Sequence, residues 1–175
     1  MSTRLPGNWH PRAEVPPTGP VVLLDLDGVI ADAEHRQRFL HQDEPDWTGF
    51  YAGVGADGVI AAGRALAGAV DGGLAVLILT GRVDDVSSAT RAWLEENRIR
   101  WDMLICRPAQ EDDEARHAVD YKRDEIAQLR RLGYEPALAA DDNRKIVAMY
   151  EQEGIPTLYV PSGYYDNSNR YDGGV

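Results

Sequence analysis

Short apolar runs alternate with longer amphipathic segments along most of this 175-residue chain, and this alternation restricts its fold more than any other feature. Short runs of this kind predict buried strands, because helices cover both faces of a parallel sheet. The predicted strands are Val21–Leu26, Leu74–Leu79, Asp102–Cys106, Ala137–Ala140 and Thr157–Val160. The predicted helices are Asp84–Asn97 (with Asp84 or Asp85 as its cap), Lys122–Leu132 and Asn143–Glu153. This order predicts an α/β fold, a doubly wound, Rossmann-like parallel sheet of about five strands.

The chain length suits one domain with a sizeable core. We expect that domain over residues 20–161, between an irregular N-terminal leader (1–19) and an irregular C-terminal tail (162–175). No run approaches the roughly 18 apolar residues of a membrane span, and the leader lacks the apolar core of a secretory signal. A cytoplasmic protein without a membrane partner is therefore expected. Cys106 lies in an apolar run, which indicates a small buried hydrophobic residue rather than a nucleophile.

The formal net charge of −11 weighs against a broad basic surface for gripping nucleic acid. A narrow cationic groove remains compatible with this charge, because Arg36, Arg38, Arg82 and Lys122 could converge in the fold. Contact with a nucleic acid would then be limited to a chain end.

Polar side chains follow the first predicted strand at the edge where α/β sheets bind ligands. In the segment LLDLDGVIAD, the period of two places Asp25 and Asp27 on the same side of the strand. Two such carboxylates repel each other at the end of a buried strand unless a cation is present. Gly28 allows the backbone to turn tightly beside a ligand. An Asx turn with solvated aspartates is the alternative interpretation.

The other strand ends add a hydroxyl, two cations and further acids. Thr80 opens a predicted loop and is followed by Arg82, a pair that suits a phosphate group. Lys122 supplies a point charge able to neutralise an oxyanion. Asp141 and Asp142 offer the hard oxygen ligands that Mg²⁺ prefers. Each of these could singly be a helix cap or a surface charge, but their common edge indicates a shared site.

In this order the residues resemble the haloacid dehalogenase superfamily of phosphohydrolases, over roughly Val21 to Val160. The four matching motifs are Asp25-Leu-Asp27-Gly28-Val29, Thr80, Lys122 and Asp141-Asp142. Within that superfamily the chain looks most like the 3′-phosphatase domain of phage-type polynucleotide kinases. The features that carry this closer resemblance are Thr80-Gly81-Arg82, Val119–Ile126, Asp141-Asp142-Asn143-Arg144, Gly154-Ile155-Pro156 and the distance of Arg36 from Asp25.

Two departures accompany this resemblance. The phage-type enzymes are commonly fused to a P-loop kinase, and the motif GxxxxGKS/T is absent here, so kinase activity is not expected. Gly28-Val29 also replaces the Gly-Thr that follows the second aspartate in the phage-type domain.

The resemblance implies Mg²⁺-dependent hydrolysis of a phosphomonoester through an aspartyl-phosphate. Asp25 would be the nucleophile and Asp27 the general acid and base. Mg²⁺ would be bound by Asp25, by Asp27 through its backbone carbonyl, and by Asp142, with Asp141 beside them. The remaining implied site residues are Thr80 and Lys122 at the phosphoryl oxygens, and Arg36, Gly81 and Arg82 at the substrate.

Little of the span Ile30–Gly73 is left for a lid, because helices are expected near Ala33–His41 and Asp57–Val70. This minimal cap predicts an exposed site, which favours large or chain-end substrates. The aromatic residues of the span can either stack on a base or form a small hydrophobic plug. These residues are Trp47, Phe50 and Tyr51.

Three functions stay open at this point. The first is a phosphatase acting on nucleic-acid 3′ ends, and the second is a small-molecule phosphatase for nucleotides or sugar phosphates, which the acidic net charge favours. The third is a catalytically silent phosphate- or Mg²⁺-binding module, although such a module has no need for Asp27. The sequence leaves the oligomeric state undetermined.

Overall fold

The computed structural model describes residues 4–108 and 118–165. Its main sheet has six strands in the order β1-β6-β5-β2-β7-β8, with β1 antiparallel to β6 and the other pairs parallel. The strands are β1 (Trp9–Pro11), β2 (Gly19–Leu24), β5 (Ala75–Val83), β6 (Met103–Arg107), β7 (Tyr134–Asp141) and β8 (Thr157–Tyr159). The predicted doubly wound α/β sheet is confirmed, with one antiparallel strand added at its edge.

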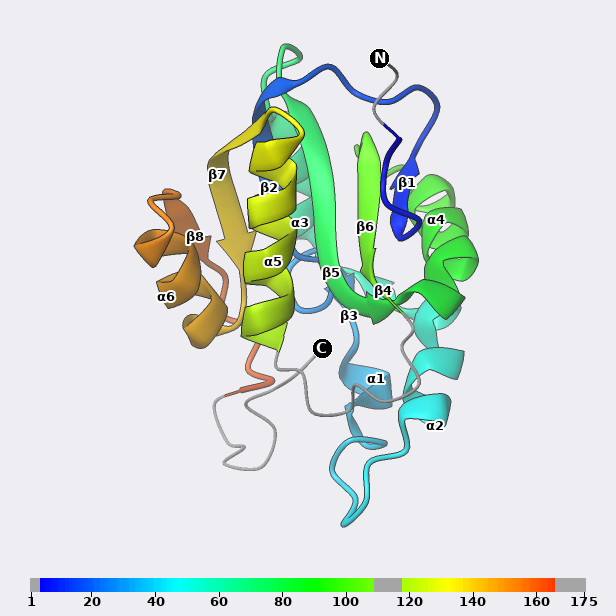
Figure 1. Cartoon of the computed structure of the whole chain (residues 1–175). Helices are drawn as coiled ribbons and strands as arrows, with labels where there is room; N and C mark the ends of the chain where they lie inside the picture. The colour runs from blue at the N-terminus through cyan, green and yellow to red at the C-terminus, as the bar shows by residue number, and fades with distance from the viewer. Residues whose placement is uncertain (1–3, 109–117, 166–175) are drawn as a thin grey trace.

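Helices cover both faces of this sheet, and Figure 1 shows α5 and α3 on opposite sides of it. The longer helices are α3 (Ala61–Ala69), α4 (Ser87–Glu96), α5 (Ala118–Arg131) and α6 (Arg144–Gln152). Successive side chains of the central strand β2 point to opposite faces of the sheet. Leu23 packs in a buried cluster with Ile126 of α5, whereas Leu24 packs in another with Trp93 of α4. Because both faces are buried, the strands read as continuous apolar runs.

Strand β5 is longer than predicted. It continues through Val83, where pairing with Arg107 of β6 resumes after an irregularity that follows Leu79. Thr80, Gly81 and Arg82 therefore lie within a strand rather than in the predicted loop.

The predicted cap of the following helix is wrong. Helix α4 begins at Ser87 with Val86 at its N-cap and no capping side chain, while Asp84 and Asp85 lie in the 3-10 turn η2 (Asp84–Val86). Asp84 instead contacts His10 at 2.6 Å, which ties the start of this helical segment to β1.

The N-terminal leader is not wholly irregular, because it contains β1. Trp9 of this strand is 3% exposed, and its Nε1 donates a hydrogen bond to Glu125 Oε2 of α5 at 2.7 Å. The leader is thus part of the packed core at this point.

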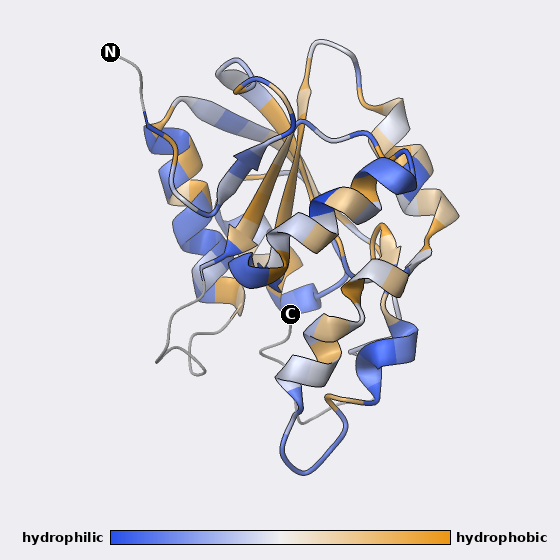
Figure 2. Cartoon of the chain, turned by 90° about the vertical axis from the view of Figure 1, so that its right-hand side faces the viewer, coloured by the Kyte–Doolittle hydropathy of each residue, from blue (hydrophilic) through white to orange (hydrophobic). Residues whose placement is uncertain are grey.

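A small appendage connects β2 to α3 beyond one end of the main sheet, where Figures 1 and 2 show α1 and α2. Its elements are β3 (Ala31–Asp32), α1 (Glu34–Gln37), α2 (Trp47–Ala52), η1 (Val54–Ala56) and β4 (Gly58–Val59). Strands β3 and β4 form an antiparallel pair. Phe50 is fully buried against Leu40, with Trp47 and Tyr51 packed around them, so these aromatic residues form the hydrophobic plug.

Among the described residues, no helix combines the length and the apolar character needed to cross a bilayer.

Candidate active site

Three carboxylates and one ammonium group meet where the central strands end. Asp25 directly follows β2, Asp141 ends the neighbouring strand β7, and Asp142 comes next. Their carboxylate oxygens lie within 4.8 Å of one another. Lys122 reaches them from α5, with its Nζ 2.7 Å from Asp141 Oδ2 and 3.0 Å from Asp25 Oδ1. The predicted residues Asp25, Lys122, Asp141 and Asp142 are therefore brought together.

This acidic cluster is almost completely removed from water, so the prediction of an exposed site is wrong for these residues in the free protein. The carboxylates of the cluster are at most 3% exposed. Burial, partly offset by Lys122, raises the pKa of Asp25 from 3.8 to about 7. Burial and the neighbouring charge of Asp25 raise the pKa of Asp142 from 3.8 to about 9. Ionising all three acids beside a single lysine leaves two uncompensated negative charges.

The hydrogen bonds of the cluster single out the oxygens that fit a divalent cation. Asp141 is occupied, since Oδ2 accepts from Lys122 and Oδ1 accepts from the Asn143 backbone N–H at 2.9 Å. Both oxygens of Asp142 are buried and accept no hydrogen bond of good geometry from the described residues, whereas Asp25 Oδ1 has its ion pair with Lys122 at 3.0 Å. Unpaired buried carboxylate oxygens are costly, and hard oxygen ligands of this kind suit Mg²⁺. The donor set therefore fits a magnesium ion.

The Asp27 carboxylate lies in a second cluster, with two arginines. Arg36 Nη2 lies 2.5 Å from Asp27 Oδ1, and Arg82 Nη2 lies 2.6 Å from the same oxygen. Burial opposes ionisation of Asp27, but Arg82 and Arg36 outweigh it and lower the pKa of this carboxyl group. Asp57 completes the cluster by contacting both arginines, so two buried cations face two buried anions.

The remaining predicted residues line the same edge. Thr80 is 1% exposed, and its Oγ1 accepts a hydrogen bond from the Arg82 backbone N–H at 3.2 Å, which leaves the hydroxyl proton available for a ligand. The carbonyl of Gly81 faces the Tyr51 hydroxyl at 3.5 Å. Burial, with the nearby charge of Asp27, raises the pKa of Tyr51 to about 12, so this hydroxyl stays protonated.

Glycine is required at position 28 because the Asp142 carboxylate lies close to the backbone there. The φ of Gly28 is +79°, and a Cβ at this position would lie 2.0 Å from Asp142 Oδ2 and 2.9 Å from Ser162 Cβ. A residue with a side chain would therefore displace Asp142 from its place beside Asp25.

Two features of the site could not be found from the sequence. Asp57 follows no predicted strand, so nothing in its local pattern connects it to Asp27. The start of the C-terminal tail also reaches the site, because Ser162 lies beside Gly28 and Asp142. Tyr164 ties the tail to the appendage, since its Oη accepts from the Ala33 N–H at 2.8 Å and donates to Asp32 Oδ1 at 3.0 Å. The remainder of the predicted tail, beyond Tyr165, lies outside the described residues.

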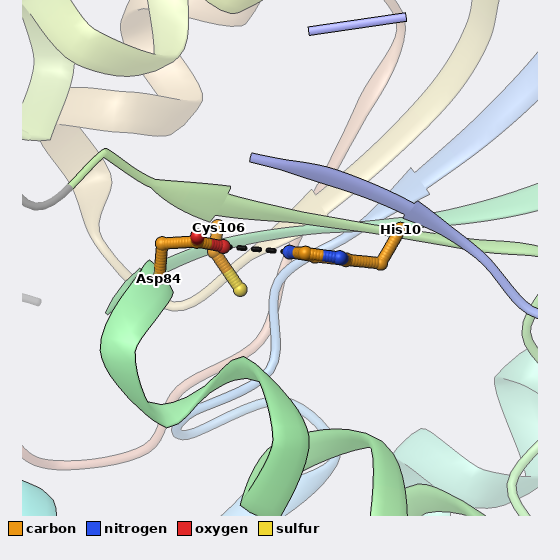
Figure 3. Close-up of side chains that lie close together, drawn as sticks. All are labelled: His10, Asp84 and Cys106. Carbon is orange, nitrogen blue, oxygen red and sulfur yellow. Dashed lines mark hydrogen bonds and ion pairs between the residues drawn. The ribbon is translucent and has the colours of Figure 1, made fainter. Parts of the chain in front are cut away.

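A further group of potential metal ligands lies elsewhere, formed by His10, Asp84 and Cys106 (Figure 3). The 2.6 Å contact between His10 Nε2 and Asp84 Oδ1 satisfies these two side chains without a metal. Burial raises the pKa of the Cys106 thiol to about 12, and the residue is fully buried. The prediction that Cys106 is a small buried residue is confirmed.

Comparison with known proteins agrees with this architecture. A sequence model of the polynucleotide kinase PNKP phosphatase domain matches residues 19–165. A comparison with curated proteins found no match. Among solved structures, two chains of Pnkp1/Rnl/Hen1 complexes, one titled an RNA repair complex, superpose with a TM-score of 0.64 at 21% and 20% identity. Both superpositions cover 82% of this chain, which spans only 42% and 45% of those chains.

Two other solved structures share the fold. A haloacid dehalogenase-like hydrolase from Streptococcus pneumoniae has a TM-score of 0.53 at 15% identity, covering 79% of this chain and 83% of its own. A class C acid phosphatase from Bacillus anthracis has a TM-score of 0.58 at 13% identity, covering 86% of this chain and 69% of its own. The family match extends over most of the described chain. The chain is therefore a phosphatase of the haloacid dehalogenase superfamily and belongs to the polynucleotide kinase PNKP phosphatase-domain family.

Proposed function

We propose that this phosphatase is a Mg²⁺-dependent phosphomonoesterase that uses Asp25 as its nucleophile and acts on nucleic-acid 3′ ends. The observation that carries the proposal is a set of buried groups: the Asp142 carboxylate, whose two oxygens accept no hydrogen bond of good geometry from the described residues, beside Asp25 and its ion pair with Lys122. Such a set is unfavourable in isolation, and a divalent cation with a phosphoryl group would complete it.

Asp25, Asp142 and the backbone carbonyl of Asp27 would hold the magnesium ion. When bound, Mg²⁺ offsets the repulsion between the Asp25 carboxylate and the anionic phosphoryl group. Asp141 has a different task, because both of its oxygens already accept hydrogen bonds. It orients Lys122, and together with Asp25 it raises the pKa of this lysine well above its usual value, despite burial.

The reaction then depends on groups that the fold holds in place. Asp25 attacks phosphorus and forms an acyl phosphate, while the leaving oxygen departs with a proton. Lys122 and the Thr80 hydroxyl stabilise the equatorial oxygens through hydrogen bonds. Water then cleaves the acyl phosphate and returns Asp25 to its starting state.

Asp27 would move the proton in both halves of this reaction. In the free protein the two arginines keep it ionised, as a base must be. When an anionic substrate draws Arg36 and Arg82 toward itself, their hold on Asp27 weakens, and burial then favours its protonated form. Asp27 could thus protonate the leaving oxygen and later deprotonate the attacking water.

The small appendage and the two buried arginines support a substrate with an accessible phosphate and neighbouring negative charge. A nucleic-acid 3′ end meets both conditions, and the family match points the same way. The net charge of −11 favours the second candidate, a small phosphorylated metabolite, because an acidic surface repels a polynucleotide. The silent module is less favoured, since it offers no reason for two arginines to surround Asp27.

Phosphate release from three substrates separates these functions. The substrates are a 3′-phosphorylated oligonucleotide, its 5′-phosphorylated twin and a 3′-mononucleotide, each tested with Mg²⁺ and with a chelator. We expect Mg²⁺-dependent release that is fastest from the first. Preference for the mononucleotide would instead establish the metabolic phosphatase. Release from none of them, compared with an Asp25→Asn preparation as the blank, would contradict the proposed activity.

A further inference from the structure

Asp57 binds both arginines that contact Asp27. Its carboxylate accepts hydrogen bonds from Arg36 Nε and Nη2 at 2.8 and 2.9 Å, which is a two-pronged contact, and from Arg82 Nη2 at 2.5 Å. The Asp57 side chain is 0% exposed, against 7% for Asp27. Asp57 thus forms the inner partner of each arginine, and Asp27 the partner nearer to solvent.

The carboxylate of Asp57 is itself held from several elements. Its backbone carbonyl accepts a hydrogen bond from Trp93 Nε1 of α4 at 2.8 Å. His35 of α1, which is partly exposed, places Nε2 2.8 Å from Asp57 Oδ1. The residue also lies directly between η1 and β4, where the appendage returns to the main domain. These contacts fix Asp57 independently of the arginines.

We propose that Asp57 is a positioning residue, which holds Arg36 and Arg82 as a preassembled pair of donors for the anionic part of the substrate. This inference rests on the proposed function of the site. Without Asp57, two buried guanidinium groups would share the single carboxylate of Asp27 in the free protein, and the uncompensated buried cation would be strongly unfavourable. With Asp57 in place, each arginine can exchange Asp27 for the substrate and remain paired.

The geometry of Arg36 supports this exchange. Its guanidinium lies 4.2 Å from the centre of the Phe50 ring, which holds the group flat against the plug. Nη1 is buried and has no hydrogen-bond partner among the described residues. Arg36 therefore has a donor to offer while Nε and Nη2 stay on Asp57.

Two substitutions separate a positioning role from a purely structural one. Asp57→Asn keeps the shape and removes the charge, whereas Asp57→Glu keeps the charge and shifts it by one methylene. We expect both variants to raise the KM for the best phosphomonoester, and the inhibition constant of inorganic phosphate, by about tenfold or more, while kcat changes by less than about threefold. Asp84→Asn is the matched control, because it removes the ion pair with His10 outside the site and should leave KM unchanged.

If Asp57 only balances buried charge, both substitutions will lower the melting temperature and leave KM at the wild-type value. That result would overturn the proposal. Should the Asn variant fail to fold, the Glu variant decides alone, since a charge-balancing role predicts an unchanged KM and a positioning role predicts a raised one.

A measurement on the free protein tests the same claim without any activity. Among the described residues, the Arg36 Nε–H donates to Asp57 and the Arg82 Nε–H donates to Asp27. In NMR spectra of arginine side chains, either Asp57 variant should shift or broaden the Arg36 Nε–H signal, and that of Arg82 to a lesser extent, because Asp57 contacts Arg82 through Nη2. Two unchanged signals would contradict the positioning role. If the wild-type protein released no phosphate, the proposed function would fail while this NMR test still stood.

Discussion

Gly28 shows how closely the backbone of the first motif approaches the acidic cluster. Its positive φ alone disfavours other residues, but Gly154 has nearly the same φ, at +76°, and a Cβ added there would meet nothing within 4 Å. Substituting either glycine would therefore strain the backbone. Only a side chain at position 28 would also clash with Asp142. This difference separates the effect of strain from the effect on the site.

We expect Gly28→Ala to lower phosphatase activity by at least about tenfold and to weaken Mg²⁺ activation, because the new methyl group displaces the Asp142 carboxylate. Gly154→Ala should lose a similar amount of thermal stability and keep its activity. Mg²⁺ titrations of activity on both variants make this comparison. Equal activity in the two proteins would mean that the contact with Asp142 is unimportant.

The site residues that can be identified from the sequence share one property, which is that they stand at or just beyond the ends of apolar strands. The sequence predicts that Asp25, Thr80 and Asp141 lie at one edge of the sheet, because parallel strands align their carboxyl ends. Asp57 and Ser162 cannot be placed in this way, since each reaches the site from an irregular segment whose path depends on tertiary packing. Lys122 comes from a helix that follows a strand, and its sequence position indicates only a charge able to neutralise an oxyanion.

At the scale of elements, the sheet could be predicted well and its edges poorly. The parallel strands β2, β5 and β6 are buried over most of their length and therefore give continuous apolar runs, whereas β1 has the sequence WHP, with a proline and no period. The predicted helix cap at Asp84 is wrong because this residue has a tertiary contact that the local sequence does not reveal. The competing partner of this aspartate is His10, which is distant in the sequence.

We expect strand β1 to contribute to the free energy of unfolding. Trp9 packs on the core, lies 6.4 Å from the Tyr134 ring and bonds Glu125 of α5. We expect Trp9→Ala to lower the free energy of unfolding by about 3–5 kcal/mol, because a buried aromatic side chain is lost. Val15→Ala, at a position that is 54% exposed, is the control and should change it little. Denaturant titration measures both, and similar midpoints would show that the leader is not part of the cooperative unit.

At the scale of the whole molecule, the two charge clusters behave differently. The arginine cluster is balanced, with two cations and two carboxylates, whereas the acidic cluster carries three carboxylates and one lysine. The free protein must therefore keep protons on the acidic cluster, or bind a cation there. We therefore expect cation binding at the acidic cluster to depend on pH.

Stability should depend on pH in a defined direction. The pKa values of Asp25 and Asp142 are raised in the folded protein, to about 7 and about 9, so the stability they contribute is complete below about pH 4 and is lost as pH rises toward 9. Asp27 has the opposite shift and matters only at lower pH. We expect the metal-free protein to melt at a lower temperature at about pH 8 than at about pH 6.

Mg²⁺ should reverse this trend, because it binds the deprotonated carboxylates and competes with protons. Thermal melts with and without Mg²⁺ should show a larger stabilisation at about pH 8 than at about pH 6, and Asp142→Asn should reduce it. A stabilisation that is equal at both pH values, or unaffected by Asp142→Asn, would mean that the ion binds elsewhere.

The most direct test is the transfer of radiolabelled phosphate from the substrate to Asp25, followed by acid quenching during turnover. Wild-type protein should carry label that hydroxylamine removes, as expected for an acyl phosphate, on the peptide that contains Asp25. Asp25→Asn protein, shown to be folded by its melting curve, should carry no label and release no phosphate above the blank. Continued turnover by this variant, or label on another residue, would contradict the assignment of Asp25 as the nucleophile.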